Sequence, residues 1–566
     1  MAKDLYLYLF LISHLIVELT SNYWMSGWSC NILRNLISNG YRSIIYPCKD
    51  SMIAKRDDAQ DITGTMILMG FIFAKFLLQY FLVNSQYDLH RDEYLHLDQA
   101  NHLAWGFTSV PPVTSWIALL IKLLGNTVFW VKFFPALFGA LTLLLVWKTI
   151  EEIKGNLYAL VLGATGILLS ALLRINFLFQ PNSLDVLCWT AVCFFLIKYI
   201  HTDKQKWLYV TAGTVAIGIL NKYNIAFLLI GLLPAILVTE QRKIFSQPKF
   251  YLAVSACVFL ISPNLYWQYN NDFPVFKHMK ELHDTQLVNV SRWGFLKEQL
   301  FYFIGALPVI IASLYALLFY KPFKNYRFFF WTFLFTLFIF IYLRAKGYYA
   351  IGLYPVYIAF GAVFLGKALQ GGWKRYMQPV LLMLPVIFYV LLFTVFYSIE
   401  SPDEIRKRKE VYQELGLLRW EDGKEHVLPQ DFADMMGWKE LAAKMEVIYN
   451  KLPRDTHTLI LCDNYGQAGA INYYVKNKNI RAVSFNADYI NWFNLDKKIE
   501  NLIRVKELDG SHEELKETSP FFNQSYVAAS ITNPLAREYG TTIFVFMQSK
   551  IDVNARLRSE IEKVKK

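Results

Sequence analysis

Long apolar runs separated by short polar segments occupy the chain up to about residue 400. A membrane-spanning helix needs about 20 mainly apolar residues, and fewer where it ends in a cavity lined by protein. Eleven runs fit, some of them short: 64–83, 127–147, 156–173, 184–200, 207–220, 223–239, 250–268, 299–320, 328–343, 349–368 and 377–397. The segment 113–124 is only about half a span long, which predicts an interfacial or re-entrant helix. The pattern predicts a polytopic α-helical membrane protein with about 11 transmembrane helices.

The pattern changes after the last apolar run. The chain becomes charged and carries an amphipathic helical period in FADMMGWKELAAKMEVIYNKL, then four strand candidates, HTLILC, IRAVSF, SYVAAS and TTIFVFM, and a basic C-terminal helix. This alternation predicts a soluble α/β domain. We expect three regions: an N-terminal extension at 1–61, a transmembrane domain at 62–400 and the α/β domain at 401–566. The extension has no signal-peptide pattern, and Met52 is an alternative start.

Basic residues in short connections predict the orientation, because cytoplasmic loops carry an excess of Lys and Arg. Alternate connections hold two or three basic residues each: KTIEEIK, HTDKQK, EQRKIFSQPK, KPFKNYR and GKALQGGWKR. We therefore expect these five loops in the cytoplasm. The opposite set then faces outward: 84–126, the turn RINFLFQPNS, the junction NKYN, 269–298, the turn RAKGYY and the chain after Ser398.

Composition supports a membrane protein and argues against other classes. Of the 566 residues, 55% are hydrophobic and only 18% are charged, which is too apolar for a soluble protein of this size. The net charge of +12 does not indicate nucleic acid, because the basic residues lie in short clusters between apolar runs. The six cysteines have neither disulfide-framework nor metal-ligand spacing and are interpreted as inert core residues.

The outward connections carry charged residues at similar depth. Asp92 and Glu93 are adjacent in the first of them, and isolated charges follow in the others, at Arg174, Asp185, Lys222, Arg344 and Lys346. Each alone is more often a structural residue at the membrane boundary. Together they predict a cavity open to the outer leaflet, with carboxylates on one side and cations on the other. That arrangement suits a carboxylate base that activates a hydroxyl while Lys and Arg hold a departing phosphate.

The order of several motifs resembles a known family. The chain has DE in the first outer loop, Pro111 and Pro112 about twenty residues later, an Asp after Pro181, a Lys in ILNKYN, then SPNLYWQYNNDFPVFKHM and KGYYAIGLYPVYIAFGA. This series resembles bacterial glycosyltransferase family 39, which includes protein O-mannosyltransferases and the aminoarabinose transferase that modifies lipid A. The resemblance covers roughly residues 62–400, and NYGQAGAINYY also resembles tails of bacterial members. It implies the C-type (GT-C) glycosyltransferase fold.

The resemblance also implies a reaction. A polyprenyl-phosphate-linked sugar would be the donor, and a lipid, glycan or protein the acceptor, at the outer face of a bacterial inner membrane, with inversion at the sugar carbon. Asp92 would be the general base, Glu93 would orient the acceptor or a metal ion, and Lys222 would bind the donor phosphate. The remaining carried-over positions are Asp185 at the start of the fourth span, Lys346, Tyr348 and Tyr349 in the turn that lines the lipid-phosphate site, and His278 as a donor or metal contact. From their charge and their position in the outward turns, we also expect Arg344 among the donor-phosphate ligands and Arg174 elsewhere in the site.

One departure and two alternatives stay open. Where the aminoarabinose transferases carry Glu and Lys before the Pro pair, this chain has Ser109 and Val110, which leaves a divalent metal ion and that phosphate contact undecided. His90, His96 and His102 could supply ligands instead, although six-residue spacing is no ligand signature. A membrane transporter of an anionic or lipid-linked substrate would also use broken helices and buried ions. A ligand-gathering membrane subunit, with the soluble domain as its functional part, is the third hypothesis.

Overall fold

The computed structural model describes residues 49–397, 400–453, 456–477 and 479–565. The chain divides into two compact units, residues 1–73 and 74–566, which are described separately. In the first unit the described part is the beginning of α2 (Lys49–Phe81). The apolar stretch near the N-terminus and most of the predicted extension lie outside the described residues, and the alternative start at Met52 stays a prediction.

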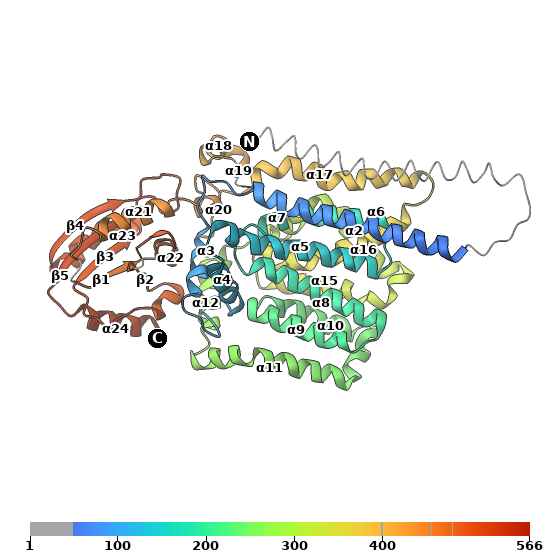
Figure 1. The fold of residues 1–566 in the computed structure, drawn as a ribbon, viewed down its shortest axis with the longest axis horizontal. Coiled ribbons are helices and arrows are strands. Elements are labelled where there is room, and N and C mark those ends of the chain that lie inside the picture. Colours follow the sequence, from blue (N-terminus) through green and yellow to red (C-terminus); the bar gives the residue numbers. More distant parts are fainter. Residues whose placement is uncertain (1–48, 398–399, 454–455, 478, 566) are drawn as a thin grey trace, which may run out of the picture. The chain divides into compact units, whose positions relative to one another are not determined.

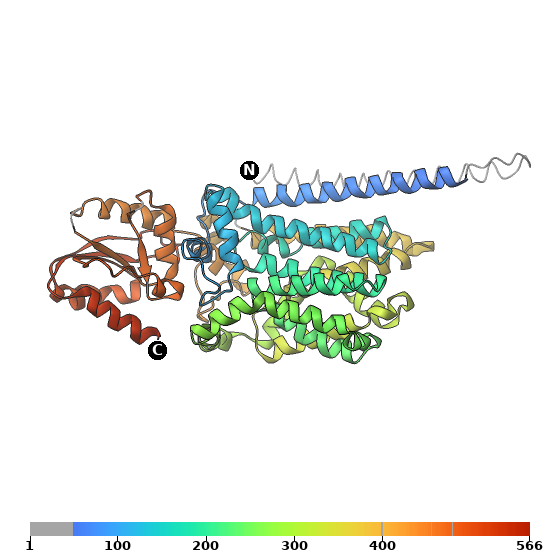
Figure 2. The ribbon, with the colours of Figure 1, turned by 60° about the horizontal axis from the view of Figure 1, so that its bottom comes forward.

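All eleven predicted apolar runs coincide with helices, several of which run side by side in both views (Figure 1, Figure 2). They are α2, α5 (Val128–Glu152), α6 (Leu157–Leu168), α8 (Asn182–Thr202), α9 (Lys206–Asn221), α10 (Ile225–Leu237), α11 (Pro248–Asn270), α13 (Arg292–Tyr302) with α14 (Leu307–Phe319), α15 (Phe328–Tyr342), α16 (Tyr354–Ala368) and α17 (Met377–Phe396). The predicted half-length helix at 113–124 is α4 (Val113–Leu123). Short helices in the connections are α3 (Arg91–Gln99), α7 (Leu172–Ile175) and α12 (Pro274–Thr285).

Six described helices are long and apolar enough to cross a membrane, and the number rises to eight if each of two bent pairs is one span. The other predicted runs form the shorter helices α6, α9 and α15, so the count of eleven spans stays a prediction. Of the long spans, α8 and α16 are the most buried and α11 is the least. A helix that is apolar on all sides can lie either in the middle of the bundle or at its edge, because its neighbours are then other helices or lipid.

The run 299–320 is broken, which the apolar pattern did not indicate. Helices α13 and α14 meet at an angle of 70° around the 3₁₀ turn Ile304–Ala306. Gly305 lies so close to α17 that an added Cβ would be 2.4 Å from the Cα of Pro385. Pro308 then occupies the first turn of α14, where its missing N–H costs no hydrogen bond. The break therefore follows from a contact distant in sequence together with a local helix-start signal.

The C-terminal region forms a five-stranded sheet in the order β2-β1-β3-β5-β4. Its strands are β1 (Thr458–Cys462), β2 (Ala482–Ser484), β3 (Asn501–Lys506), β4 (Phe522–Ser530) and β5 (Thr542–Ser549). The pairs β1–β2 and β1–β3 are parallel, whereas β5 is antiparallel to β3 and β4. Its helices are α18 (Pro402–Lys407), α19 (Lys409–Glu414), α20 (Gln430–Ala433), α21 (Trp438–Tyr449), α22 (Tyr465–Tyr474), α23 (Leu508–Thr518) and α24 (Val553–Lys565).

Alternating strand residues build two cores, one on each face of the sheet. Ile460, Ile503 and Val545 point to the face covered by α21 and α22. Leu461 and Phe544 point to the opposite face, where α24 packs. Successive side chains of a strand point to opposite faces, so a strand with apolar residues at consecutive positions serves both cores. The four strand candidates are confirmed, and β3 was missed.

The first core also contains residues of the segment 84–126. Tyr94 and Leu95 of α3 and Ile121 of α4 join Trp438 and Leu441 of α21 in one buried cluster. Close approach requires glycine in α22, because a Cβ at Gly469 would lie 2.7 Å from the Cβ of Tyr94. The α/β domain is thus packed on the segment that carries the predicted catalytic carboxylates.

Candidate functional site

Local sequence signals place Asp92 and Glu93 in the first turn of α3. His90 is the N-cap: its Nδ1 accepts the backbone N–H of Asp92 at 3.2 Å, and its own N–H donates to Glu93 Oε2 at 2.7 Å. This is a capping box with histidine in place of Ser or Thr. Carboxylates in a first helical turn are stabilised by the unpaired N–H groups and the helix dipole. The helix start therefore fixes the backbone position of both acidic residues.

Asp92 has a hydrogen bond to each carboxylate oxygen. The Tyr465 hydroxyl donates to Oδ1 at 2.6 Å, and Gln180 Nε2 donates to Oδ2 at 2.9 Å. Burial would raise the pKa of Asp92, but the charges of His90 and Arg91 and the hydrogen bond from Tyr465 lower it to about 2. The side chain is still 36% exposed. Asp92 is therefore an ionised carboxylate that a substrate can reach.

A continuous series of side-chain hydrogen bonds joins Asp92 to Lys222. Gln180 accepts from Asn182 Nδ2 at 2.9 Å, and Asn182 Oδ1 accepts from Lys222 Nζ at 2.7 Å. We call Asp92, Gln180, Asn182 and Lys222 the polar chain. Helix α9 ends at Asn221, and Lys222 has extended backbone angles (φ −157°, ψ 129°) in the break before α10. The predicted base and the predicted phosphate ligand therefore belong to one network.

Aromatic side chains and a buried carboxylate enclose the lysine end of the polar chain. The Lys222 ammonium lies 4.5 Å from the ring centre of Tyr349 and 5.2 Å from that of Tyr348, both in the 3₁₀ helix Gly347–Leu353. Asp185 accepts hydrogen bonds from Trp189 at 3.0 Å and from Asn224 at 2.8 Å. It is 5% exposed. Asp185 therefore links α8 to the α9–α10 break that carries Lys222.

The structure brings the other predicted cations to different places. Lys346 donates to Gln286 Oε1 at 2.6 Å and pairs with Glu421. Arg344 is exposed, with a left-handed φ of 52°, so it does not enter the polar chain. His278 is half-buried on α12, and burial lowers its pKa against the opposing charges of Glu281 and Asp488. Lys346 thus contacts both the connection 269–298 and the C-terminal region, and His278 lies on α12 within that connection.

Glu93 and Arg174 are occupied by protein contacts. Glu93 is fully buried, and both of its oxygens lie 2.8 Å from Lys132 Nζ. The N–H of Phe179 also donates to Glu93, at 2.7 Å. Arg174 donates to Asp431 at 3.1 Å and stacks near the rings of Phe177 and Phe432. In this structure Glu93 holds α3 against α5 and the α7–α8 connection, and Arg174 contacts the C-terminal region.

Five residues of this site were not singled out from the sequence: Lys132, Gln180, Asn182, Asn224 and Tyr465. Gln180 and Asn182 flank Pro181 in a turn expected to face outward, which was an available signal. Lys132 is a lone cation inside an apolar run, where a charged residue usually has a function or a partner. Tyr465 lies in the motif NYGQAGAINYY, but that motif did not single it out, because its contact with Asp92 depends on the packing of α22 against α3.

The residues around Asp92 do not fit a metal site. Among the residues that the structure describes, no group of three or more His, Cys, Asp or Glu side chains is arranged to hold an ion. Both Glu93 oxygens are taken by Lys132, and His90 Nδ1 accepts a backbone N–H. His96 contacts Gln99 and His102 stacks on Trp492, so the three histidines have separate partners. The donor atoms of Glu93 and His90 Nδ1 are therefore already occupied by protein contacts.

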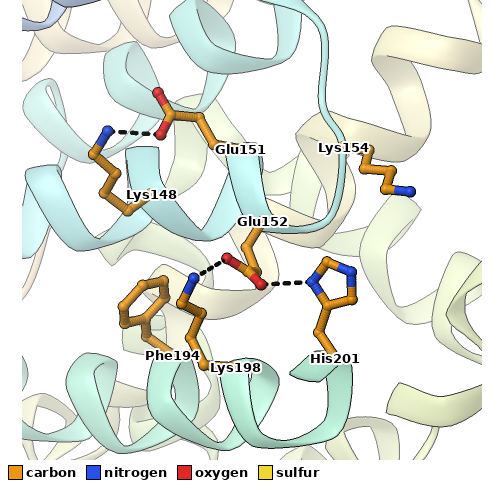
Figure 3. A pocket seen from close by; sticks show the side chains of 7 residues that line it. All are labelled: Lys148, Glu151, Glu152, Lys154, Phe194, Lys198 and His201. Atoms are coloured by element: carbon orange, nitrogen blue, oxygen red, sulfur yellow. Dashed lines mark hydrogen bonds and ion pairs between the residues drawn. The ribbon is translucent and has the colours of Figure 1, made fainter. Parts of the chain in front are cut away.

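A cavity of about 410 Å³ lies at the opposite end of α5 and α8 (Figure 3). Glu152 bonds Lys198 and His201 there, each at 2.5 Å, and Lys148 bonds Glu151 at 2.7 Å. From residue 132 to residue 152 a helix rises about 30 Å. The cavity is therefore separate from the polar chain, and it is lined by the loop KTIEEIK and by the last turns of α8.

The fold is that of the GT-C membrane glycosyltransferases. Two solved structures of ArnT from Cupriavidus metallidurans share it: the apo form, with a TM-score of 0.59 and 15% identity, and the form bound to undecaprenyl phosphate, with a TM-score of 0.57 and 14% identity. Each match covers 85% of this chain and 98% of the ArnT chain. The fold class expected from the sequence is confirmed.

Sequence comparisons agree with the fold. A family model described as dolichyl-phosphate-mannose-protein mannosyltransferase matches residues 109–267. The lipid A galacturonosyltransferase RgtD of Rhizobium johnstonii is 24% identical over 237 residues, which are 41% of this chain. The match spans 49% of that relative, about half of its length. These matches confirm the resemblance to PMT/ArnT-like glycosyltransferases. Together with the apolar helices, they support a multi-pass bacterial membrane protein.

Proposed function

We propose that the protein transfers a sugar from a polyprenyl-phosphate donor to an acceptor hydroxyl, with inversion and with Asp92 as the general base. One observation carries this proposal: the polar chain joins an accessible, ionised carboxylate to a lysine through two hydrogen-bonded amide side chains. A base and a phosphate ligand in one network are the two groups that such a transfer needs. The fold and the relatives supply the reaction class.

On the donor side, Lys222 is the phosphate ligand of the proposal. A hydrogen bond from an ammonium to a phosphate oxygen is charge-assisted and strengthens in a site with little water. Tyr348 and Tyr349 border the ammonium, and Lys346 adds a second cation nearby. ArnT binds undecaprenyl phosphate, which is the product that our donor would leave. The exposed Arg344 has no place in this part of the proposal.

On the acceptor side, Asp92 takes the proton of the acceptor hydroxyl. The hydroxyl oxygen forms a bond to the first carbon of the sugar, while the bond from that carbon to the phosphate oxygen breaks. The electron pair leaves with the polyprenyl phosphate, whose developing charge the Lys222 ammonium stabilises. Attack from the face opposite to the leaving phosphate inverts the configuration. Glu93 and Asp185 act as positioning residues, because their oxygens are already hydrogen-bonded.

The proposed location follows the distribution of basic residues. With the Lys- and Arg-rich connections in the cytoplasm, α3 and the α/β domain face the periplasm of a bacterial inner membrane. A donor presented from the outer leaflet can reach the polar chain there. The acceptor is a lipid, a glycan or a protein, and the relative that acts on lipid A favours a lipid among these.

Release of free polyprenyl phosphate tests the function. Purified protein in detergent is incubated with a panel of labelled polyprenyl-phosphate sugars and candidate acceptors. We expect release that depends on the acceptor and disappears in Asp92→Asn. A transporter or a ligand-gathering subunit would bind the donor without cleaving it, so binding without release from any donor of the panel would contradict the proposal.

Cysteine labelling tests the orientation. Single cysteines replace exposed residues in a background without native cysteines: Ser85 before α3, Glu410 in α19 and Lys204 between α8 and α9. An impermeant maleimide added to intact cells should label positions 85 and 410 but not 204. Labelling at 204 alone would reverse the topology and place the polar chain in the cytoplasm.

A further inference from the structure

Tyr465 is held against Asp92 from several sides. It is the first residue of α22, whose N-cap Asn464 accepts the N–H of Gln467. The Arg91 guanidinium lies 4.4 Å above its ring centre. A Cβ on the neighbouring Gly466 would come within 2.9 Å of Arg91, so glycine there leaves room for the stacking. These contacts fix the ring while its hydroxyl reaches Asp92.

The position of Tyr465 in the sheet is one that α/β domains use for ligands. Strand β1 is flanked by the parallel strands β2 and β3, and Tyr465 follows its carboxyl end. In open α/β sheets, ligands bind outside the carboxyl ends of parallel strands where the strand order reverses. Here α3 occupies that place, with the Asp92 carboxylate as the group contacted. The edge of the sheet at which α/β domains commonly bind ligands therefore lies beside the proposed base.

We propose that Tyr465 is a positioning residue for Asp92, so that the C-terminal α/β domain completes the active site. The inference rests on the proposed function. A 2.6 Å hydrogen bond from a phenol to a carboxylate is short and charge-assisted. Together with Gln180 on the other oxygen, it fixes the plane of the carboxylate and leaves the remaining lone pairs for the acceptor hydroxyl. It also favours the ionised form, which is the form that acts as a base.

Other titratable groups face Asp92. They come from four elements: His90, Arg91 and His96 on the α3 segment, Tyr465 on α22, Asp431 on α20 and Tyr348 in the turn before α16. The cations and the phenol hydrogen bond favour the charged carboxylate, whereas Asp431 opposes it. Removal of the Tyr465 hydroxyl leaves all the other groups in place. Its effect on Asp92 can therefore be measured separately.

The test compares Tyr465→Phe with Tyr474→Phe. Tyr474 lies on the same helix and donates no hydrogen bond to Asp92; its hydroxyl accepts from Tyr94 at 3.1 Å. Phenylalanine keeps the ring in both variants, so the packing of α22 is preserved. A hydrogen bond to a charged group is worth about 10- to 100-fold. We expect kcat of Tyr465→Phe to fall by that factor with the donor KM unchanged, and Tyr474→Phe to behave like wild type.

The pH dependence separates positioning from packing. Without the phenol hydrogen bond, the carboxylate should protonate at higher pH, so the ratio of the Tyr465→Phe rate to the wild-type rate should fall as pH is lowered from 6 to 4. Other titrating groups cancel in this ratio. A flat ratio, or an equal loss in Tyr474→Phe, would overturn the inference. If Asp92→Asn retains activity, the proposed function fails instead, whereas a wild-type-like Tyr465→Phe beside an inactive Asp92→Asn overturns only the role of Tyr465.

Discussion

The two ends of α5 both carry a lysine paired with a glutamate, in different surroundings. At the start of the helix, Lys132 is 10% exposed and Glu93 is fully buried. At its end, the Lys148 and Glu151 side chains are 49% and 38% exposed, and they are only three residues apart (Figure 3). The first pair joins segments 39 residues apart, whereas the second is a local contact on one helical turn. The same type of ion pair therefore links two buried segments at one end of α5 and two exposed positions of one helix at the other end.

The two ends of α5 differ in the number of chain segments that meet there and in whether a charged group stays accessible. Around Asp92, groups from α3, the α7–α8 connection, the α9–α10 break and α22 meet in one network, and the carboxylate keeps a free face. At the other end, Glu151 bonds Lys148 on its own helix, and both Glu152 oxygens are occupied by Lys198 and His201 of α8, so only two helices meet there. Exposed ion pairs contribute little to stability. A charged cluster is therefore a site candidate when distant segments deliver it and leave one group accessible.

The largest effect is expected at Asp92. Replacement by Asn keeps the size and one hydrogen-bond acceptor but removes the base, which should lower the transfer rate by about 10² to 10⁴-fold. Labelled sugar transfer at saturating donor measures this. Glu152→Gln, at the other end of the bundle, is the matched control and should change the rate less than twofold. Comparable losses of rate in both variants would contradict the assignment of the active site to the Asp92 end of the bundle.

The next effect concerns folding stability. Lys132→Ala leaves the Glu93 charge buried without its partner, and breaking a buried pair in this way costs about 3 to 5 kcal/mol. Thermal unfolding in detergent should show a much lower Tm than for wild type. Lys148→Ala removes the partner of Glu151, in a pair whose side chains are 49% and 38% exposed, and should cost about 1 kcal/mol or less. Equal destabilisation in the two variants would mean that burial does not determine how much each ion pair contributes to stability.

A smaller effect is expected at Lys222. Its replacement by Ala removes a charge-assisted contact to the donor phosphate and should raise the donor KM by about tenfold or more. The acceptor KM should stay within twofold. Lys148→Ala, which removes an exposed ammonium far from the polar chain, should leave both constants unchanged. An unchanged donor KM in Lys222→Ala would contradict the phosphate role.

The smallest effect is a pH dependence of stability. The pKa of Asp92 is lowered to about 2 in the folded protein, below its ordinary value of 3.8. The ionised carboxylate therefore stabilises the fold fully above pH 4, and this contribution is lost as pH falls toward 2. The Tm difference between wild type and Asp92→Asn should narrow from pH 5 to pH 3. A difference that stays constant over this range would mean that Asp92 is not held in its charged form by the fold.

Most of the helices could be predicted because apolar runs of bilayer length are a strong signal. The break at Gly305 was missed because it depends on the backbone of Pro385. Strand β3 was missed because NLIRVK carries Arg504 and Lys506 among its apolar residues. Arg504 pairs with Asp463 at 2.5 Å, so tertiary contacts make these charges acceptable in the strand. Local patterns give elements, and contacts distant in sequence decide how they end.

The same division applies to the site. Asp92, Asp185, Lys222, Tyr348 and Tyr349 were selected as ionisable or motif residues, and the structure brings them into one region; their roles stay predictions. Gln180 and Asn182 are neutral amides, whose importance follows only from the partners that they connect. Arg344 was selected for its charge and membrane depth, yet its left-handed turn leaves it exposed. Charge identifies candidates, but geometry selects among them.

The glycines of α22 have a consequence for exchanging domains between relatives. Gly466 and Gly469 let the helix approach Arg91 and Tyr94 so closely that any larger side chain would collide with them. A chimera that joins this membrane region to the tail of another protein must therefore reproduce both glycines as well as Tyr465. A transplanted tail that lacks these glycines could be joined at a surface linker, but its larger side chains would push α3 out of place. We expect such chimeras to insert into the membrane normally and to fail in catalysis.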